Sequence, residues 1–356
     1  MNDKMLFEQQ LARYPKLHVQ DLVKAMYQSE FGPGHFVDEN GPGREYLRRE
    51  LAECTGVQRE CKDAFVEPLG GGHVRVHLNV MAQNGLSPET LFRLFVLSGQ
   101  EKCGDMQNFR ARLDALEGMI EAGELPLDIA DSKAFLAQYR EAGCPSTHHS
   151  DQFRQAYAPA YRVIRAEYAN ALPLLCAIDR LMAEKERVTV AIEGGSASGK
   201  TSLSRLLSQL YDCNIFHMDD FFLQPHQRTP ERFAEPGGNV DRERFLTEVL
   251  QPLQIGEPFS YRVFDCSCMA LGGAVDVQPK QLNIVEGAYS MHPELADAYD
   301  LSAYLAVDPA LQAERILHRN GVKMQQRFLN EWIPLEHRYF EHMRVPERCA
   351  LTLRME

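Results

Sequence analysis

The sequence lacks the features that mark membrane, secreted and nucleic-acid-binding proteins. No apolar run reaches the roughly 18 residues that a membrane span needs, and residues 1–8 do not form a signal-peptide core. The nine cysteines are scattered without Cys-x-x-Cys pairs, which indicates reduced thiols and neither a disulfide framework nor a zinc site. Acidic residues outnumber Lys and Arg by 50 to 38, whereas nucleic-acid binders normally carry a basic excess. We therefore expect a cytoplasmic protein with no membrane and no nucleic-acid partner.

The length of the chain predicts two domains. A chain of 356 residues exceeds what one hydrophobic core usually supports, and a hydrophobic content of 44% is enough for two cores. The charged, helix-prone segment 177–187 leads into an apolar run, so we place the boundary after residue 186. The expected domains are 1–186 and 187–356.

The two halves differ in their apolar pattern. The second half alternates short apolar runs with helical patterns, which predicts an α/β domain with a parallel sheet covered by helices. We expect strands at 188–192, 214–218, 282–285 and 303–307. The first half is mostly helical, with apolar residues at three- and four-residue spacing in 19–30, 88–97, 105–121, 132–141 and 150–172. Its exception is the alternating segment 73–80, a strand with one polar face made of His73, Arg75, His77 and Asn79.

Residues 194–201 read Gly-Gly-Ser-Ala-Ser-Gly-Lys-Thr, a complete G-x-x-x-x-G-K-[ST] motif between an expected strand and an expected helix. Glycines permit torsions closed to other residues, so successive N–H groups can converge on phosphate oxygens at a helix N-terminus. Lys200 would reach the β- and γ-phosphates, and the Thr201 hydroxyl would ligate Mg²⁺. The alternative is a chance glycine-rich turn. The expected nucleotide-binding residues are Gly194, Gly195, Ser196, Ala197, Ser198, Gly199, Lys200, Thr201 and Ser202.

Three acidic residues follow expected strands on the same side of the sheet as the motif. Asp219 and Asp220 come after the second strand, where a carboxylate can act as general base toward an acceptor hydroxyl or as an outer ligand of Mg²⁺. Glu286 ends the third strand, where an acid can hold Mg²⁺ through water. The alternatives are a solvated loop or a helix cap for the two aspartates, and a surface acid for Glu286.

Basic residues are spaced by four along the helical segment that follows the last expected strand. Arg315 and Arg319 share one helical face, and Lys323 and Arg327 continue it. Such a stripe could close over a triphosphate as a lid, and we expect Arg315 and Arg319 to act there. The alternative is a solvated helix face.

The order of these motifs resembles the uridine kinase family, whose relatives include phosphoribulokinase, pantothenate kinase and nicotinamide riboside kinase. The resemblance covers residues 187–345 and adds Asn239-Val240-Asp241 and Phe264-Asp265 to the motifs above. It implies ATP- and Mg²⁺-dependent phosphorylation of a small-molecule hydroxyl. By the same resemblance Asp219 is the base, with Asp220 the alternative. Expected acceptor contacts are Asp220, Asp241, Phe264 and Arg228, the last in the basic loop 224–232, which could also be merely solvated.

One departure from the family concerns the acceptor. Uridine kinases usually follow the equivalent of Phe264-Asp265 with a histidine that reads the pyrimidine base, and here Cys266 to Met269 contain none. The sequence therefore does not name the acceptor. It also leaves open ATP against GTP, and the oligomeric state, a homo-oligomer included.

The first half resembles no family that we can name, but it contains a set of candidate residues. His35, His73, His77, His148 and His149 could assemble a metal or phosphate site if the fold brings them together. Alternatively, Ser150 or Asp151 caps the following helix and the histidines are merely exposed. Three functions stay open: a small-molecule kinase, a nucleotide-dependent regulator, and a bifunctional enzyme whose first half has a separate binding or hydrolytic activity.

Overall fold

The computed structural model describes residues 1–33, 41–54, 64–100 and 104–355. The chain divides into two compact units, Met1–Ala169 (unit 1) and Asn170–Glu356 (unit 2). Helix α10 (Leu172–Glu184) packs on strands β4 and β9 of unit 2, so the segment before residue 187 covers the sheet of that unit. None of the helices in the described residues has the length and apolar character needed to cross a bilayer.

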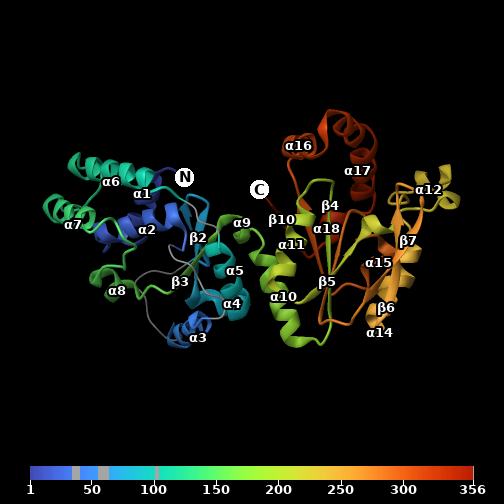
Figure 1. Ribbon diagram of the computed structural model, residues 1–356, viewed down its shortest axis with the longest axis horizontal. Helices are drawn as coiled ribbons and strands as arrows, with labels where there is room; N and C mark the ends of the chain where they lie inside the picture. The colour runs from blue at the N-terminus through green and yellow to red at the C-terminus, as the bar shows by residue number, and fades with distance from the viewer. Residues whose placement is uncertain (34–40, 55–63, 101–103, 356) are drawn as a thin grey trace. The chain divides into compact units, whose positions relative to one another are not determined.

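Unit 2 is built on a parallel sheet of five strands in the order β10-β9-β4-β8-β5 (Figure 1). The strands are β4 (Val188–Gly194), β5 (Cys213–His217), β8 (Leu282–Glu286), β9 (Leu301–Ala306) and β10 (Leu351–Arg354). The four predicted strands and their parallel pairing are confirmed, as is the predicted α/β architecture of a P-loop-type parallel sheet with flanking helices. The central strand β4 carries the glycine-rich motif at its carboxyl end.

Both faces of this sheet are covered, which explains why its strands are apolar without alternation. Helices α10 and α11 (Lys200–Leu210) pack on one side, as Figure 1 shows. On the other side Ala191, Phe216 and Val285 belong to a core cluster with Phe245 and Tyr339 from the following helices. Burial of these side chains fixes the strand ends in one row.

The segments after β5, β8 and β9 supply further helical elements of unit 2. They are η2 (Met218–Phe221), η3 (Pro225–Gln227), α12 (Pro230–Ala234), α13 (Arg242–Phe245), the π-helical η4 (Leu246–Leu250), α14 (Gln251–Ile255), α15 (Pro293–Ala296), α16 (Pro309–Arg327), the π-helical η5 (Phe328–Trp332), α17 (Ile333–His342) and α18 (Val345–Arg348). An antiparallel hairpin of β6 (Phe259–Asp265) and β7 (Ala270–Val277) was not predicted. Strand β7 is mostly exposed, so its sequence lacks the apolar run that predicts a buried strand.

Unit 1 is mostly helical, as predicted, with one antiparallel sheet in the order β1-β2-β3. Its elements are α1 (Asp3–Arg13), α2 (Val19–Phe31), α3 (Gly43–Cys54), β1 (Val66–Gly70), β2 (His73–His77), η1 (Leu78–Val80), α4 (Met81–Asn84), α5 (Pro88–Gln100), α6 (Met106–Glu121), α7 (Ile129–Glu141), α8 (Asp151–Tyr157), β3 (Tyr161–Arg165) and α9 (Ala166–Ala169). A core of Phe7, Leu22, Phe109, Leu136 and Phe153 joins α1, α2, α6, α7 and α8. The predicted α+β character is therefore confirmed.

Two sequence predictions in unit 1 were wrong in extent. The helix predicted at 150–172 ends at Tyr157, because Ala158 turns into the left-handed region at a φ of 40° and Pro159 follows. The chain then forms β3, which pairs with β2. The strand predicted at 73–80 ends at His77, and the 3₁₀ turn η1 takes up its last three residues. All five residues of β2 are buried, so the polar side chains of His73, Arg75 and His77 do not face solvent.

Candidate active site

The glycine-rich loop between β4 and α11 has the backbone conformation of a phosphate cradle. Gly194 has a φ of 151°, and a Cβ there would lie 2.7 Å from the Leu305 carbonyl oxygen, so only glycine fits without a shift. Ala197 and Gly199 both have left-handed backbone, with φ values of 57° and 105°. Alternating backbone handedness of this kind turns successive N–H groups to one side, where they can hold an anion. The loop residues therefore fit a phosphate group.

Lys200 lies over this loop. Its Nζ donates hydrogen bonds to the carbonyl oxygens of Gly194, at 2.7 Å, and Gly195, at 2.9 Å. Thr201 and Ser202 are exposed in the first turn of α11. The ammonium group, the N–H groups of the loop and the helix N-terminus place positive charge at one spot.

A buried carboxylate beneath the loop was missed by the sequence analysis. Glu193 is fully buried, and its carboxylate accepts hydrogen bonds from the N–H groups of Gly194, at 2.8 Å, and Met291, at 3.0 Å. The Tyr339 hydroxyl donates to it at 3.1 Å. Burial raises the pKa of Glu193 to about 7. The hydrogen bonds favour the ionised form and oppose this rise. Glu193 thus connects the glycine-rich loop both to α17 and to the segment that follows β8.

Two further side chains hold the outer part of the loop at Ser196. Glu336 of α17 accepts hydrogen bonds from the Ser196 N–H, at 2.9 Å, and from its hydroxyl, at 2.6 Å. Gln312 of α16 donates to the Ser196 carbonyl oxygen at 2.7 Å. Both partners are buried. No local sequence signal identifies them, because they are 116 and 140 residues away from Ser196.

The predicted acids lie at the edge of the sheet where the glycine-rich loop begins. Asp219 belongs to η2, directly after β5, and Glu286 ends β8, next to β4. Asp219 has an exposed surface, but the protein around its carboxylate partly removes it from water and so raises its pKa. The positive charge of Lys200 lowers this pKa and opposes the rise. Glu286 raises the same pKa further, and Arg319 lowers it. Lys200, Asp219 and Glu286 are therefore close enough to act on one another electrostatically.

The two neighbouring aspartates have different surroundings. The Tyr261 hydroxyl hydrogen-bonds the Asp220 side chain, whereas Asp219 has no side-chain hydrogen-bond partner among the described residues. Arg244, which the sequence analysis did not single out, donates to the Asp220 carbonyl oxygen at 2.9 Å and lies 4.1 Å over the Phe221 ring. These contacts fix η2 and leave the Asp219 carboxylate available to a substrate.

Glu286 has a partner that the sequence analysis also missed. His217 is its register neighbour across β5 and β8, and the His217 Nδ1 lies 2.6 Å from a Glu286 carboxylate oxygen. This hydrogen bond raises the pKa of His217. No group of three or more His, Cys, Asp and Glu suited to a metal occurs in the part of the chain that the structure describes. The oxygen donors of Thr201, Asp219 and Glu286 nevertheless fit Mg²⁺, which proteins usually hold through one or two carboxylates plus substrate phosphates.

The basic stripe after β9 is only partly as predicted. Arg315 donates to the Met355 carbonyl oxygen at 2.7 Å and to that of Ala197, in the glycine-rich loop, at 3.4 Å. Arg319 acts electrostatically on Asp219, so both arginines lie near the loop or the acid. The extension to Lys323 and Arg327 was wrong as a continuous helical face, because α16 kinks at Gly321, whose φ and ψ are 74° and 171°.

The predicted acceptor contacts are in three situations. Arg228 lies 6.0 Å from the ring centroid of the buried Phe264, and both Arg228 and Asp219 act electrostatically on Cys266. Asp220 is bound to Tyr261, as described above. Asp241 is buried and caps α13, where its side chain accepts a hydrogen bond from the Arg244 N–H at 3.2 Å. Its contact with an acceptor stays a prediction.

The histidines of unit 1 do not assemble into one site. His35 lies outside the described residues. His77 binds Glu67 at 2.9 Å, His149 binds Asp21 at 2.7 Å, and His148 is exposed. Ser150 caps α8, as one alternative predicted, but His73, His77 and His149 are buried and not exposed. The predicted metal site is therefore wrong for the described residues.

Comparisons with known proteins agree with the motifs of unit 2. The chain is 29% identical over 162 residues to a uridine kinase of Oceanobacillus iheyensis, which covers 43% of this chain and 76% of that one. It is 29% identical over 147 residues to a uridine kinase of Geobacillus kaustophilus, covering 38% and 68%. Among solved structures, a possible uridine kinase from Bacillus stearothermophilus is 21% identical with a TM-score of 0.38, covering 50% of this chain and 98% of that one. No protein-family profile matches the chain. The predicted resemblance to uridine kinases is confirmed for somewhat less than half of the chain.

Proposed function

We propose that unit 2 is a kinase that transfers the γ-phosphoryl group of ATP to a hydroxyl group of a small molecule. The observation that carries this proposal is the meeting of Lys200, Asp219 and Glu286 at the carboxyl edge of the sheet, beside a loop that fits phosphate. A cation over the phosphates, a carboxylate for the acceptor proton and oxygen donors for a metal are what phosphoryl transfer needs. The likeness to enzymes named uridine kinase supports the same reaction class.

The chain's own residues account for each part of the reaction. The N–H groups of the glycine-rich loop and Lys200 hold the β- and γ-phosphates and stabilise the charge that develops there. Asp219 takes the proton of the acceptor hydroxyl as its oxygen bonds to the γ-phosphorus. The bond from that phosphorus to the bridging oxygen breaks, and ADP leaves. Thr201 and Glu286 would hold Mg²⁺, which neutralises phosphate charge when it is bound.

The lid and the acceptor pocket complete the proposal. Arg315 already contacts the loop, and Arg319 is close enough to Asp219 to lower its pKa, so both can add charge around the transferred group. Arg228 and Phe264 offer a cation and a ring, which suits a polar acceptor. The missing base-reading histidine argues against tying this pocket to pyrimidine nucleosides.

The test is ADP release from ATP and Mg²⁺ over a panel of hydroxyl compounds: uridine, cytidine, nicotinamide riboside, pantothenate, sugars and hydroxy amino acids. We expect one compound class to stimulate release, and Lys200→Ala and Asp219→Asn to abolish the stimulation. Thermal unfolding of both variants controls for loss of fold. Stimulated release that persists in a Lys200→Ala protein unable to bind ATP would overturn the proposal.

A further inference from the structure

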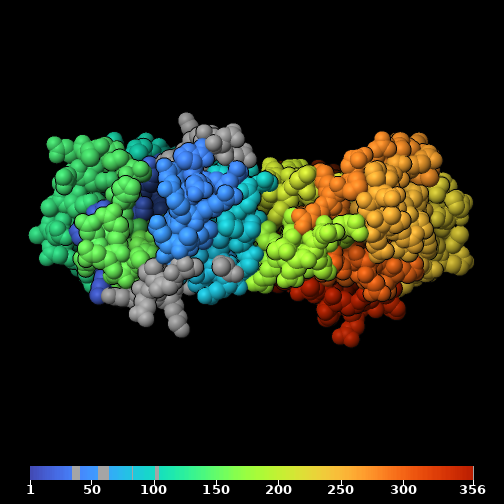
Figure 2. Space-filling model, turned by 90° about the horizontal axis from the view of Figure 1, so that it is seen from below, coloured from blue at the N-terminus to red at the C-terminus, as the bar shows by residue number. Residues whose placement is uncertain are grey.

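Unit 1 contains a cavity that the proposed kinase reaction does not use. Its volume is about 820 Å³, which is the size of pockets that hold small organic ligands. Residues of α2, α3 and the segment 146–163 line it. The space-filling view shows the surface of unit 1 recessed between the blue segment with α3 and the green segment with α8 (Figure 2).

One wall of this cavity is an ordered chain of hydrogen bonds. Hydrogen bonds from His149, Ser150 and a backbone N–H outweigh the effect of burial and lower the pKa of Asp21, so it is ionised and accepts from His149 Nδ1 at 2.7 Å. His149 Nε2 must then accept from the Tyr161 hydroxyl, at 2.7 Å. The Tyr161 oxygen accepts in turn from Gln28 Nε2 at 3.2 Å. Gln28 Oε1 accepts from Arg75 at 2.7 Å.

This chain has a fixed direction, because its ends are permanently charged. Arg75 can only donate and the Asp21 carboxylate can only accept, so every hydroxyl and amide group between them is oriented. The wall is therefore rigid and self-satisfied. It supplies no spare positive charge to the cavity, since the guanidinium of Arg75 is fully buried and paired with Glu67 at 2.8 Å.

Among the described cations that line the cavity, Lys24 is the one that forms no ion pair. Its Nζ donates one hydrogen bond, to the Thr147 carbonyl oxygen at 2.8 Å, and an ammonium group has three N–H donors. Lys24 forms no ion pair within the part of the chain that the structure describes; Asp21 acts on it electrostatically, but hydrogen bonds from His149 and Ser150 engage the Asp21 carboxylate. Burial, with a smaller effect of Arg75, lowers the pKa of Lys24 to about 8.

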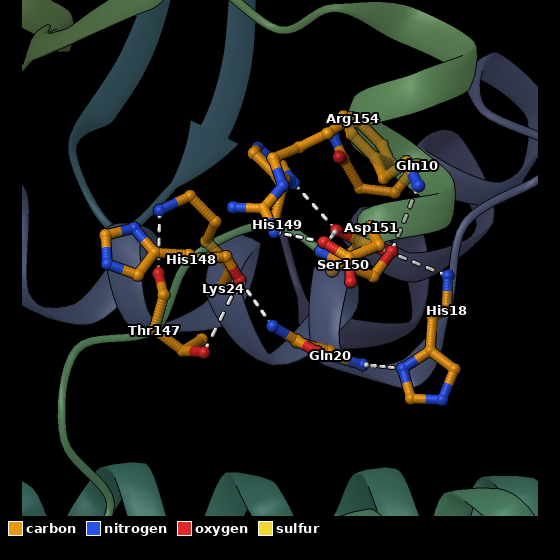
Figure 3. Close-up of polar contacts among 12 residues, drawn as sticks. Gln10, His18, Gln20, Lys24, Thr147, His148, His149, Ser150, Asp151 and Arg154 are labelled. Carbon is orange, nitrogen blue, oxygen red and sulfur yellow. Dashed lines mark hydrogen bonds and ion pairs between the residues drawn. The ribbon is translucent and has the colours of Figure 1, made fainter.

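The surroundings hold Lys24 in place. Figure 3 shows Gln20 and Lys24 reaching from α2 to the segment before α8, where Gln20 Nε2 donates to the His148 carbonyl oxygen at 2.8 Å. The other cations of the lining already have acidic partners: Arg154 pairs with Asp151, and Arg162 pairs with Glu50. Lys24 is thus a fixed, partly buried charge with unused donors that faces an open volume.

The lining also contains four aromatic rings. Tyr27, Tyr46, Phe95 and Tyr161 contribute rings around the volume. We propose that the cavity of unit 1 binds a small organic anion whose phosphate or carboxylate group lies on Lys24 and whose flat body packs among these rings. Anion and ring contacts of this kind are independent of the reaction proposed for unit 2.

Covalent trapping tests this proposal at Lys24 itself. Pyridoxal 5′-phosphate is a flat, anionic aldehyde; the amine of a lysine adds to its carbonyl carbon, water leaves, and borohydride reduces the imine to a stable amine. Full-length protein is treated with this probe or with pyridoxal, which lacks the phosphate, and the labelled peptides are mapped by mass spectrometry. Lys133, an exposed lysine of the same unit, serves as internal control. Mapping also separates labelling of Lys24 from labelling of Lys200.

We expect pyridoxal 5′-phosphate to label Lys24 at least about tenfold more than pyridoxal does, and more than it labels Lys133. Adenosine monophosphate and benzoate are then added as competitors: protection by the first alone indicates a phosphate ligand, and protection by the second alone a carboxylate. Equal labelling by the two probes, labelling no greater than at Lys133, or protection by neither competitor overturns the proposal.

A second measurement covers the chance that labelling itself perturbs the protein. Calorimetric titration with the protecting competitor is done in a Lys200→Ala background, which removes anion binding by the glycine-rich loop. Lys24→Gln should weaken binding at least tenfold, while Lys133→Gln, a matched loss of charge, should leave it unchanged. Equal affinity of the two variants contradicts a role for Lys24.

Discussion

The two units hold their polar chemistry in opposite ways. In unit 2 the phosphate cradle is made of consecutive residues whose backbone N–H groups do the binding, and its acids stand at strand ends. In unit 1 the polar groups are side chains from α1, α2, β1 and β2 that meet around the buried pair of Glu67 and Arg75. A site built from backbone leaves a local signature, because the backbone torsions demand glycine. A site built from distant side chains has no contiguous motif of this kind.

The largest difference should appear when Lys200 is replaced. Lys200→Ala removes the charge over the phosphates, and we expect kcat for phosphoryl transfer to fall by about 10³. Labelling of Lys24 by pyridoxal 5′-phosphate should not change in the same protein. Lys185→Ala is the control, because this exposed lysine of unit 2 only pairs with Asp300. A fall in both readouts would mean that the units do not work separately.

Unit 1 should be the more sensitive to loss of a single buried charge. Glu67 is buried and binds Arg75, His77, Gln10 and Tyr14. Arg75 and His77 outweigh the cost of burial and lower the pKa of Glu67, so it is charged. Glu67→Gln leaves Arg75 without its counter-charge and should destabilise the unit by about 3–5 kcal/mol.

Urea unfolding of the full chain, followed by circular dichroism, measures this loss. Glu124→Gln is the matched control, since Glu124 forms an exposed pair with Lys4 and its loss should change stability little. An unchanged midpoint in Glu67→Gln would show that the buried pair does not stabilise unit 1.

Within unit 2, replacing Asp219 should lower kcat much more than replacing its neighbour Asp220. Asp219→Asn removes the proposed base and should lower kcat at least about 100-fold, as loss of a general base usually does. Asp220→Asn keeps a hydrogen bond to Tyr261 within reach and should cost about tenfold or less. Steady-state ADP release with a single acceptor measures both. The reverse order would make Asp220 the base.

The smallest expected effect is the pH dependence of anion binding in unit 1. Because the pKa of Lys24 is lowered to about 8, its charge is present below that pH and is lost above it. Affinity should therefore be constant up to about pH 7.5 and fall towards tenfold per unit above pH 8. In this window Asp21 and Arg75 stay charged and His149 stays neutral. The other titratable groups that face the cavity are Tyr27, Tyr46, Glu50, His148, Arg154, Tyr161 and Arg162.

Calorimetry between pH 6.5 and 9.5 measures this dependence. A Lys24→Gln protein should bind weakly and with a flat profile over the same range. A fall in affinity that persists in this variant would assign the titration to one of the other groups.

The sequence predicted most of the proposed site in unit 2. Gly194 to Thr201, Asp219 and Glu286 were found because each follows an apolar strand, and parallel strands end at one edge. The side chains that hold these residues in place were missed. Glu193 lies between the expected strand 188–192 and the motif 194–201, where neither pattern singles it out, and Glu336 and Gln312 are far from Ser196 in sequence.

In unit 1 the sequence predicted the helices but not the cavity. One local signal was available. Asp21, Lys24 and Gln28 are spaced by three and four in a helix with many apolar residues, so these three polar side chains lie on one face of that helix. What this face meets could not be predicted, because β3 was taken as part of a helix. Only the pairing of β2 with β3 brings Tyr161 beside Gln28 and His149.

The three bonds at Ser196 have a mechanical consequence. Glu336 accepts hydrogen bonds from the Ser196 N–H and hydroxyl, and Gln312 donates to its carbonyl oxygen, so each polar group of Ser196 has a partner. These bonds attach the N-terminal parts of α16 and α17 to the glycine-rich loop. The left-handed Gly321 bends α16 near its C-terminal end. Ser196 therefore couples α16 and α17 directly to the glycine-rich loop, with no other residue in between.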